Sequence, residues 1–216
     1  MDVNANLGAR ERLIEGALNI FGRHGYEAAT TRMIAAEGGV NIAAIPYYFG
    51  GKEGLYRAVI SHVVDIVHQE TGKILEDIPA ISGNGNYDRD LAFSKLRTLI
   101  EELIAFIVGS SQAQRIARII LREQMYPSSA YDQIYSGFME PVLNTITMLV
   151  MAASGESSER RAKLRALTII GQILAFRVAR ETIVRSLALQ GYDSEELEEI
   201  RGIIIEHTRA ILAQIE

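Results

Sequence analysis

The segment from Thr30 to Leu55, TTRMIAAEGGVNIAAIPYYFGGKEGL, constrains the fold of this chain more than any other feature. It contains two short helical patterns joined by a pair of glycines, and a lysine opens the helix that follows a second glycine pair. Two helices joined by a short glycine-containing turn form a helix-turn-helix unit, which places its second helix in the major groove of DNA. The segment therefore predicts a DNA-binding unit.

Apolar residues at helical spacing surround this segment on both sides. An amphipathic pattern runs from Arg10 to His24, and Gly25 stands where a capping glycine belongs. Thr30 or Thr31 is expected to cap the next helix, and Asn41 the one after it. Further helices are expected at about 42–48, 52–76, 89–109, 112–126, 129–153, 158–190 and 194–215, with a loop at 77–90. No strand alternation of useful length is found, so we expect an all-α fold.

Composition limits the class of protein. The chain has 216 residues, 48% of them apolar, which is enough for a sizeable core. No apolar run is long and uncharged enough to span a membrane, and the N-terminus lacks the pattern of a signal peptide. There is no cysteine, which excludes disulfides and thiolate zinc sites and fits a cytoplasmic protein. The four histidines show no spacing suited to a metal, and no enzyme or cofactor motif is present, so we expect no metal, no cofactor and no catalysis.

The net charge of −5 does not point to nucleic acid. Residues 1–57 hold six basic and six acidic side chains, and the remainder of the chain therefore carries the whole negative balance. A strongly basic domain is the usual sign of a DNA-binding protein. The motif, not the charge, must therefore support the prediction of DNA binding.

Several side chains in the segment have the chemistry to contact DNA. Arg32 can bind guanine with two hydrogen bonds, and Thr31, Tyr47 and Tyr48 can donate hydroxyls to phosphate. Lys52 begins a helix, where its charge and the free backbone N–H groups both attract phosphate. From the pattern alone, the alternative is a plain three-helix packing unit, because helix-turn-helix geometry also occurs without DNA.

The segment TTRMIAAEGGVNIAAIPYYFGGKEGLY resembles the signature of the TetR family of transcriptional regulators, and the likeness extends over about residues 9–60. IPYYFGGKEGLY, IARIILREQMYP and IIGQILAFRVARE also resemble the CecR-like subgroup of that family. The resemblance implies a homodimer with a three-helix DNA-binding domain, placed at 1–51, and a larger helical domain for ligand binding and dimerisation, placed at 52–216. Double-stranded operator DNA and a small-molecule inducer are the implied partners.

Carried onto this sequence, the resemblance implies a DNA-binding set of Thr31, Arg32, Asn41, Ile42, Ala43, Ala44, Tyr47, Tyr48 and Lys52. Two departures from the family pattern stand out. Pro46 replaces the usual Tyr, so we expect a lost hydrogen bond and a bent or tightened recognition helix. Gly38 replaces the common Ala and is expected to add flexibility to the turn. The apolar residues Ile42, Ala43 and Ala44 can touch thymine methyl groups but cannot hydrogen-bond to a base edge.

The family also implies an inducer pocket among the helices after residue 60. Polar side chains interrupt apolar helical runs there, and a ligand site needs a few such groups on apolar walls. The candidates are Phe106, Arg118, Arg122, Tyr126, Gln172, Phe176 and Arg177. The alternative is that the arginines form structural ion pairs, as Arg177 could with Glu181, and that the aromatic residues belong to the core.

The last two expected helices carry apolar residues that the resemblance assigns to a four-helix dimer interface: Leu164, Leu167, Ile170, Leu174, Ile203, Ile204, Ile211 and Leu212. The alternative is that these faces complete the core of one chain. The sequence thus favours a dimeric repressor of a palindromic operator, released by an inducer. A helical adaptor or ligand-binding protein that has lost DNA binding is the alternative function, and an enzyme would need a nucleophile–base pair that the sequence does not supply.

Overall fold

A computed structural model describes residues 8–76 and 88–213, and every regular element in these ranges is helical, which confirms the all-α prediction. None of the described helices is long and apolar enough to cross a membrane. The chain divides into two compact units. Unit 1 contains the described residues up to His68 together with Arg115–Phe138, and unit 2 contains those from Gln69 to Gln114 and from Met139 onward.

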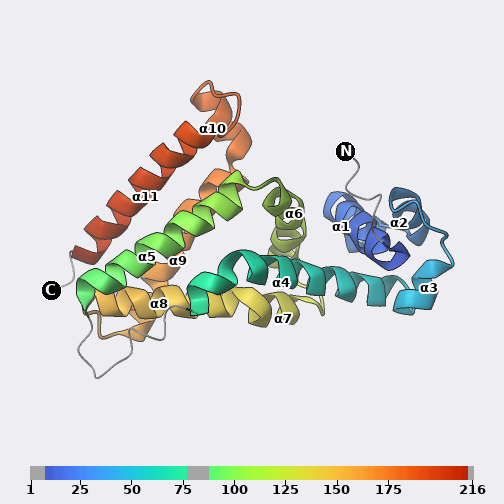
Figure 1. Ribbon diagram of the computed structural model, residues 1–216, viewed down its shortest axis with the longest axis horizontal. Coiled ribbons are helices and arrows are strands. Elements are labelled where there is room, and N and C mark those ends of the chain that lie inside the picture. Colours follow the sequence, from blue (N-terminus) through green and yellow to red (C-terminus); the bar gives the residue numbers. More distant parts are fainter. Residues whose placement is uncertain (1–7, 77–87, 214–216) are drawn as a thin grey trace. The chain divides into compact units, whose positions relative to one another are not determined.

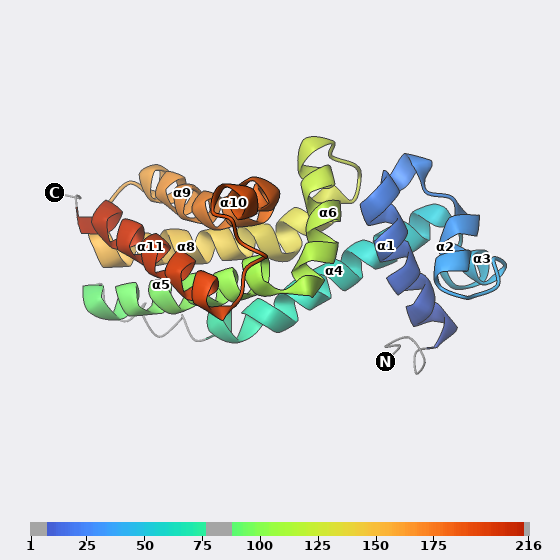
Figure 2. The same cartoon turned by 90° about the horizontal axis from the view of Figure 1, so that it is seen from above.

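Unit 1 begins with α1 (Ala9–Ala28), which packs against α2 (Thr31–Glu37) and α3 (Ala44–Phe49), as Figure 2 shows. The larger parts of α4 (Lys52–Glu76) and α6 (Ser111–Met125) and the short α7 (Tyr131–Ile134) complete the unit. Its fully buried side chains include Leu13, Phe21, Ile34, Ile45 and Leu55. Unit 1 thus extends beyond residue 51, and a functional division of the chain at residues 51 and 52 stays a prediction.

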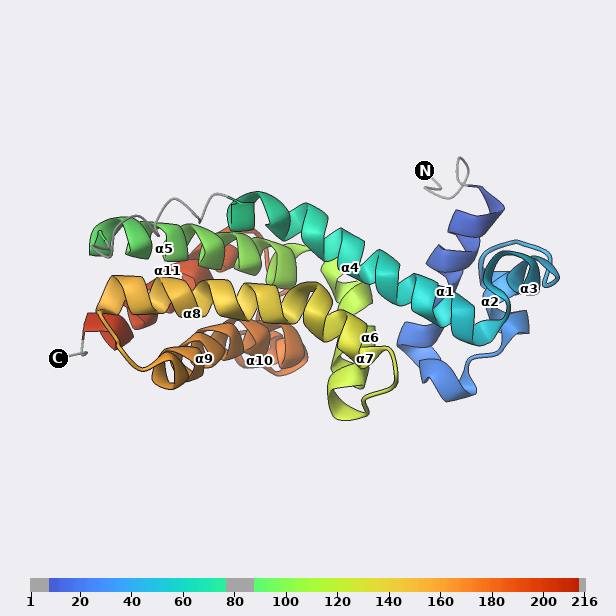
Figure 3. The ribbon, with the colours of Figure 1, turned by 90° about the horizontal axis from the view of Figure 1, so that it is seen from below.

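Unit 2 is built mainly from α5 (Arg89–Ile104), α8 (Glu140–Ser154), α9 (Glu159–Val178) and α11 (Ser194–Ala213). The helix α8 packs against both α5 and α9, and α11 packs against all three (Figures 1 and 3). Each of the four helices contributes buried aliphatic side chains to one core, among them Leu96, Ile100, Leu149, Ile169 and Ile204. The four helices therefore share one hydrophobic core.

Three of the expected helices are subdivided. The expected helix at 89–109 ends in a π-helical turn, η3 (Ala105–Gly109), and the one at 129–153 consists of α7, a second π-helical turn η4 (Tyr135–Met139) and α8. The expected helix at 158–190 breaks at Ala179 into α9 and α10 (Arg180–Ser186). Of the loop expected at 77–90, residues 77–87 lie outside the described part of the chain, and the Asp88 carboxylate caps α5.

Candidate nucleic-acid interface and effector residues

The first helix of the predicted pair, α2, is capped as the sequence predicts. The hydroxyl oxygen of Thr30 accepts a hydrogen bond from the backbone N–H of Met33 at 3.2 Å, which satisfies one of the free donors at the start of the helix. Ile34 and Ala35 are buried on the opposite side. Thr31 is half-buried, and Arg32 is exposed. One face thus holds α2 in the unit while Arg32 stays in solvent.

The glycine pair after α2 serves two different purposes. Gly39 has a φ of +58°, in the left-handed region that favours glycine. Gly38 has an ordinary helical φ of −81°. A Cβ atom on Gly38 would lie 2.8 Å from the carbonyl oxygen of Arg12, and one on Gly16 would lie 2.9 Å from the nitrogen of Gly38. The glycine at 38 therefore allows α1 and α2 to approach closely. This close approach, and not the expected flexibility of the turn, explains why a glycine stands at this position.

The second helix of the predicted pair, α3, is short and begins two residues later than expected, so Ala43 and not Asn41 is its N-cap residue. The side chain of Asn41 accepts a hydrogen bond from the N–H of Ala43 at 2.9 Å, and the carbonyl of Ile42 accepts one from the N–H of Ile45 at 3.2 Å. Pro46 is the third residue of the helix, where a backbone N–H has no partner within the helix anyway. At this position the helix has no backbone hydrogen bond for Pro46 to remove. The expected loss of a hydrogen bond from α3 is therefore wrong.

The surface of α3 exposes apolar and aromatic side chains. Ile45 is fully buried and anchors the helix, whereas Tyr47 is 80% exposed and Tyr48 43%. Ile42, in the turn before α3, is 45% exposed. The two tyrosine rings meet edge to face, with their centroids 4.9 Å apart. Asn41 and Ala43 are also exposed, and Ala44 is half-buried. Such a group of exposed apolar side chains on a short helix indicates a contact surface.

Lys52, at the start of α4, is engaged within unit 1. Its ammonium group donates to the carbonyl oxygen of Glu27 at 3.3 Å and lies 4.5 Å from the centroid of the Tyr26 ring. The lysine thus ties the start of α4 to the end of α1. An ammonium group has three donors, so two remain for a phosphate. We refer to α1, α2, α3 and the first turn of α4 as the reading head.

Gly54, which is absent from the predicted DNA-binding set, determines the junction of α3 and α4. A Cβ atom there would lie 1.9 Å from the carbonyl oxygen of Phe49. No real Cβ approaches a backbone oxygen so closely, so only glycine fits. The run GGKEGL could have drawn attention to this position, but the sequence alone does not show what approaches it.

A charged cluster joins α1 to α4 and α6 within unit 1. The carboxylate of Glu15 accepts hydrogen bonds from Nε2 of His62 at 3.0 Å and from Nη2 of Arg115 at 2.5 Å, and Arg115 also donates to Asn19 at 3.1 Å. The hydrogen bond from His62 is the largest cause, and Arg115 adds to it, so that the pKa of Glu15 falls from 4.5 to about 2 in spite of its partial burial. The position of α1 therefore depends on an ionised Glu15.

A second contact joins α4 to α6 through a buried carboxylate. The hydroxyl of Tyr56 donates to Oε1 of Glu123 at 2.5 Å, and the backbone N–H of Ser128 donates to Oε2 at 2.9 Å. Burial, together with the Glu123 carboxylate, raises the pKa of Tyr56. Glu123 is thus a structural residue of unit 1.

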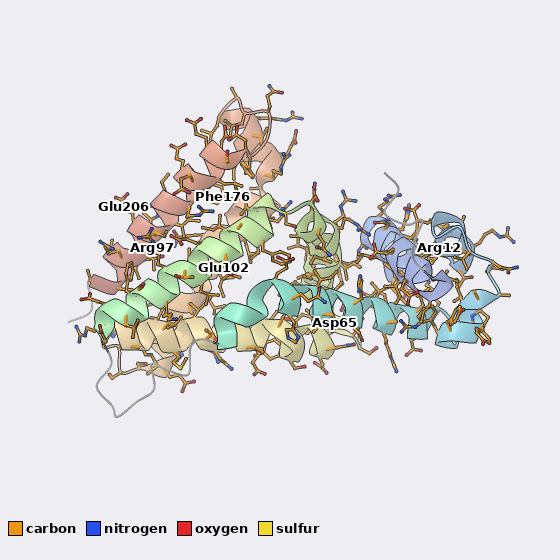
Figure 4. All side chains as sticks on the ribbon, in the orientation of Figure 1. Arg12, Asp65, Arg97, Glu102, Phe176 and Glu206 are labelled. Carbon is orange, nitrogen blue, oxygen red and sulfur yellow. The ribbon has the colours of Figure 1, made fainter. Side chains whose placement is uncertain are left out.

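The seven candidate effector residues are divided between the two units. Arg118, Arg122 and Tyr126 are exposed residues of unit 1. The other four belong to unit 2, where Phe106 is buried and Phe176, labelled in Figure 4, packs against the hydrophobic core. Within each unit these residues are compatible with a structural role, and their contact with a ligand stays a prediction.

Arg177 and Gln172 have partners inside unit 2. The guanidinium of Arg177 donates to the carbonyl oxygens of Ile107 at 2.6 Å, Val108 at 2.9 Å and Ser110 at 3.2 Å, at the end of η3. The ion pair considered between Arg177 and Glu181 does not form among the described residues, and Glu181 instead binds Arg185 at 2.6 Å. Gln172 on α9 contacts Nδ1 of His207 on α11 at 3.1 Å.

The helices α9 and α11 divide their apolar residues between two faces. Ile204 and Leu212 are buried in the core of unit 2, and Ile170 is partly buried against it. The exposed apolar residues are Leu164, Leu167, Leu174 and Val178 on α9 and Ile203 on α11. All of them except Val178 belong to the expected interface. Each helix therefore serves the core with one face and leaves apolar side chains in solvent on another.

Comparison with known proteins is consistent with this architecture. The model for the C-terminal domain of the HTH-type transcriptional dual regulator CecR matches residues 92–215, and the model for bacterial regulatory proteins of the tetR family matches residues 13–59. The HTH-type transcriptional dual regulator CecR of Shigella flexneri is 32% identical over 209 residues, which cover 94% of this chain and 91% of that protein.

Solved structures share the fold at low identity. The crystal structure of AibR in complex with isovaleryl coenzyme A and operator DNA superposes with a TM-score of 0.66 at 15% identity and covers 93% of this chain and 97% of that one. A TetR-like transcriptional regulator from Rhodococcus sp. RHA1 gives a TM-score of 0.63 at 16% identity over 95% and 96% of the two chains. Together with the matches over both parts of the sequence, the capped helix pair and the helical body show that this chain is a transcriptional regulator of the TetR family with a C-terminal domain of the CecR type.

Proposed function

We propose that the protein is a homodimer that represses transcription by binding a palindromic operator through α2 and α3, and that a small-molecule inducer releases it. The observation that carries the proposal is the exposed face of the helix-turn-helix unit. Arg32 is exposed and has no ion pair or hydrogen bond within the described residues, Tyr47 is exposed on α3, and Ile42 is exposed in the turn before it. Arginine suits guanine, hydroxyls suit phosphate, and an aliphatic side chain suits a thymine methyl group.

The neutral charge of the reading head is compatible with this role, because most of its acidic groups are already paired. Glu37 binds Arg23 at 3.3 Å, Glu53 binds Arg57 at 2.6 Å, and Glu15 binds Arg115 and His62. A paired carboxylate repels phosphate less than a free one does, since its charge is neutralised locally. Arg32 thus remains an unpaired cation among the described residues, whereas Glu15, Glu37 and Glu53 are paired within the protein.

The exposed face of α9 supports the proposal of a dimer. Leu164, Leu167, Gly171, Leu174 and Val178 recur at alternating spacings of three and four residues, which is the pattern of a helix–helix seam. Nothing lies within 4 Å of a Cβ atom built on Gly171, so a partner helix can approach its backbone. A second copy of this chain is the occupant that we propose, since two-fold symmetry would present two recognition helices to a palindromic site.

Two similar proteins bear on the ligand and on the direction of regulation. AibR forms a complex with isovaleryl coenzyme A and operator DNA, which supports a small-molecule effector for a body of this fold. The Shigella relative is a dual regulator. Activation at some promoters is therefore the second candidate function for this chain.

An electrophoretic mobility shift on the DNA that flanks the protein's own gene tests the proposal. Arg32→Ala should weaken operator binding by about 1–3 kcal/mol, because it removes a contact to a base. Arg97→Ala is the control, since Arg97 is an exposed arginine of unit 2 paired with Glu101. No shift with the wild-type dimer would contradict the proposed function and favour a helical adaptor. Equal losses of specific and non-specific affinity would make Arg32 a phosphate contact only.

A further inference from the structure

Two arginines of unit 2 lie beside Tyr192 without a carboxylate partner among the described residues. The guanidinium carbon of Arg180 lies 5.6 Å from the centroid of the Tyr192 ring. Arg177 precedes Arg180 by three residues, across the break between α9 and α10, and the Tyr192 hydroxyl binds the carbonyl oxygen of Phe176, the residue before Arg177. The nearest acidic residue in sequence, Glu181, is occupied by Arg185. Neither guanidinium is therefore paired with a carboxylate in the part of the chain that the structure describes.

Backbone groups and a ring hold these side chains in place. Nε and Nη2 of Arg177 donate hydrogen bonds to three carbonyl oxygens at the end of η3. Nη1 makes no hydrogen bond in the described structure. The hydroxyl of Tyr192 donates to the carbonyl oxygen of Phe176 at 3.1 Å. A Cβ atom on Gly191 would lie 3.2 Å from Nη2 of Arg180, so this guanidinium lies directly against residue 191. The two cations are thus positioned in advance of any ligand.

The electrostatic surroundings of the pair are unfavourable in the absence of an anion. Partial burial first, and then the charge of Arg180, lower the pKa of Arg177. Burial likewise raises the pKa of Tyr192, whereas both arginines act to lower it, and no carboxylate contributes to either shift. Two like charges held together and partly removed from water cost free energy that a bound anion would recover. Guanidinium groups suit carboxylate and phosphate oxygens because they present parallel N–H donors.

We propose that Arg177 and Arg180, held beside Tyr192, form an anion-binding site in unit 2, and that it takes the carboxylate or phosphate group of the effector. The description of this ligand as an effector rests on the proposed function. Arg180 provides the charge that is free of backbone contacts, and Arg177 provides Nη1. The apolar part of such a ligand would extend away from the site.

The test uses the full-length protein and three probes with the same alkyl chain: octanoate, octyl phosphate and octanol. Isothermal titration calorimetry at constant ionic strength should show saturable binding of at least one anion and binding at least tenfold weaker for octanol. Which anion binds more tightly distinguishes a carboxylate from a phosphate effector. Equal binding of all three probes, or of none, would overturn the site.

Arg180→Gln should weaken binding of the preferred anion at least tenfold, and Arg180→Lys should restore part of it because the charge returns. Arg185→Gln is the matched control on the same helix, since Arg185 already pairs with Glu181. Arg177 is not the variant of choice, because its loss would also free three carbonyl groups at the end of η3. Unchanged affinity in Arg180→Gln, with an unchanged melting temperature, would overturn the proposal.

A parallel DNA-binding titration separates this inference from the proposed function. The preferred anion should lower operator affinity of the wild type and have at least tenfold less effect on Arg180→Gln, which should bind operator normally without ligand. An anion that binds through Arg180 but leaves operator affinity unchanged would overturn the assignment to the effector. Absence of operator binding by the wild type would instead contradict the proposed function and leave the anion-binding result standing.

Discussion

Lys52 illustrates how a single side chain in the reading head can have both an internal and an external partner. Its contacts with Glu27 and Tyr26 hold α4 to α1, and its remaining donors are those that we predict to contact phosphate. Lys52→Ala should weaken binding to all DNA sequences alike and reduce the slope of log K against log salt by about 1. Fluorescence anisotropy at several salt concentrations measures both quantities. An unchanged affinity and slope would restrict Lys52 to its internal contacts.

Glu15 should make the stability of unit 1 depend on acid pH. Because its pKa is about 2 in the folded state and 4.5 for an ordinary glutamate, its contribution is fully present above about pH 4.5 and is lost as the pH falls toward 2. Thermal melts of the wild type and Glu15→Gln between pH 3 and 7 isolate this contribution from other carboxylates. The difference in melting temperature should shrink as the pH falls, and a difference independent of pH would contradict the role of the charge.

Among the elements, those with regular periodicity could be predicted from sequence and those that depend on packing could not. The Thr30 cap and the apolar spacing of α1 identify their helices locally. The π-helical turns η3 and η4 continue the neighbouring helices without a loop between them, and the break at Ala179 carries no glycine or proline signal. Likewise, Arg32 and Tyr47 could be chosen by side-chain chemistry, but the need for glycine at 38 and 54 arises from backbone that only the folded chain brings close.

The junction of α3 and α4 gives a prediction at the scale of elements. Gly54→Ala should displace α3, because the new Cβ would overlap the carbonyl oxygen of Phe49. Operator affinity should fall at least tenfold while the helical content measured by circular dichroism stays nearly the same. Gly72→Ala is the control, since nothing lies within 4 Å of a Cβ atom there. Normal operator binding by Gly54→Ala would show that α3 tolerates the shift or that it is not the recognition helix.

The face of α9 gives a second prediction at this scale. Replacing Leu167 and Leu174 with glutamate should yield monomers, because both leucines are exposed in one chain and would place charges in the proposed seam. Leu91→Glu is the control, as an exposed leucine on α5. Sedimentation equilibrium measures the mass of each variant. An intact dimer in the double variant would place the interface elsewhere.

At the scale of the whole molecule, charge and function are divided along the sequence. The net charge of −5 comes from the residues after 57, while the reading head is neutral with most of its acids paired. An acidic body disfavours contact with phosphate, so we expect DNA to be bound through the reading heads alone. Non-specific binding should consequently be weak at physiological salt, and specific contacts through α2 and α3 should dominate.

Hydroxyl-radical footprinting of the operator is the measurement that tests the central claim most directly. A dimer that reads DNA with two recognition helices should protect two half-sites related by two-fold symmetry, with their centres about 34–36 Å or a multiple of that distance apart. The preferred effector should remove both protected segments together. A single unsymmetric protected segment, or protection that survives the simultaneous loss of Arg32, Tyr47 and Tyr48, would contradict DNA recognition by a symmetric pair of α2–α3 units.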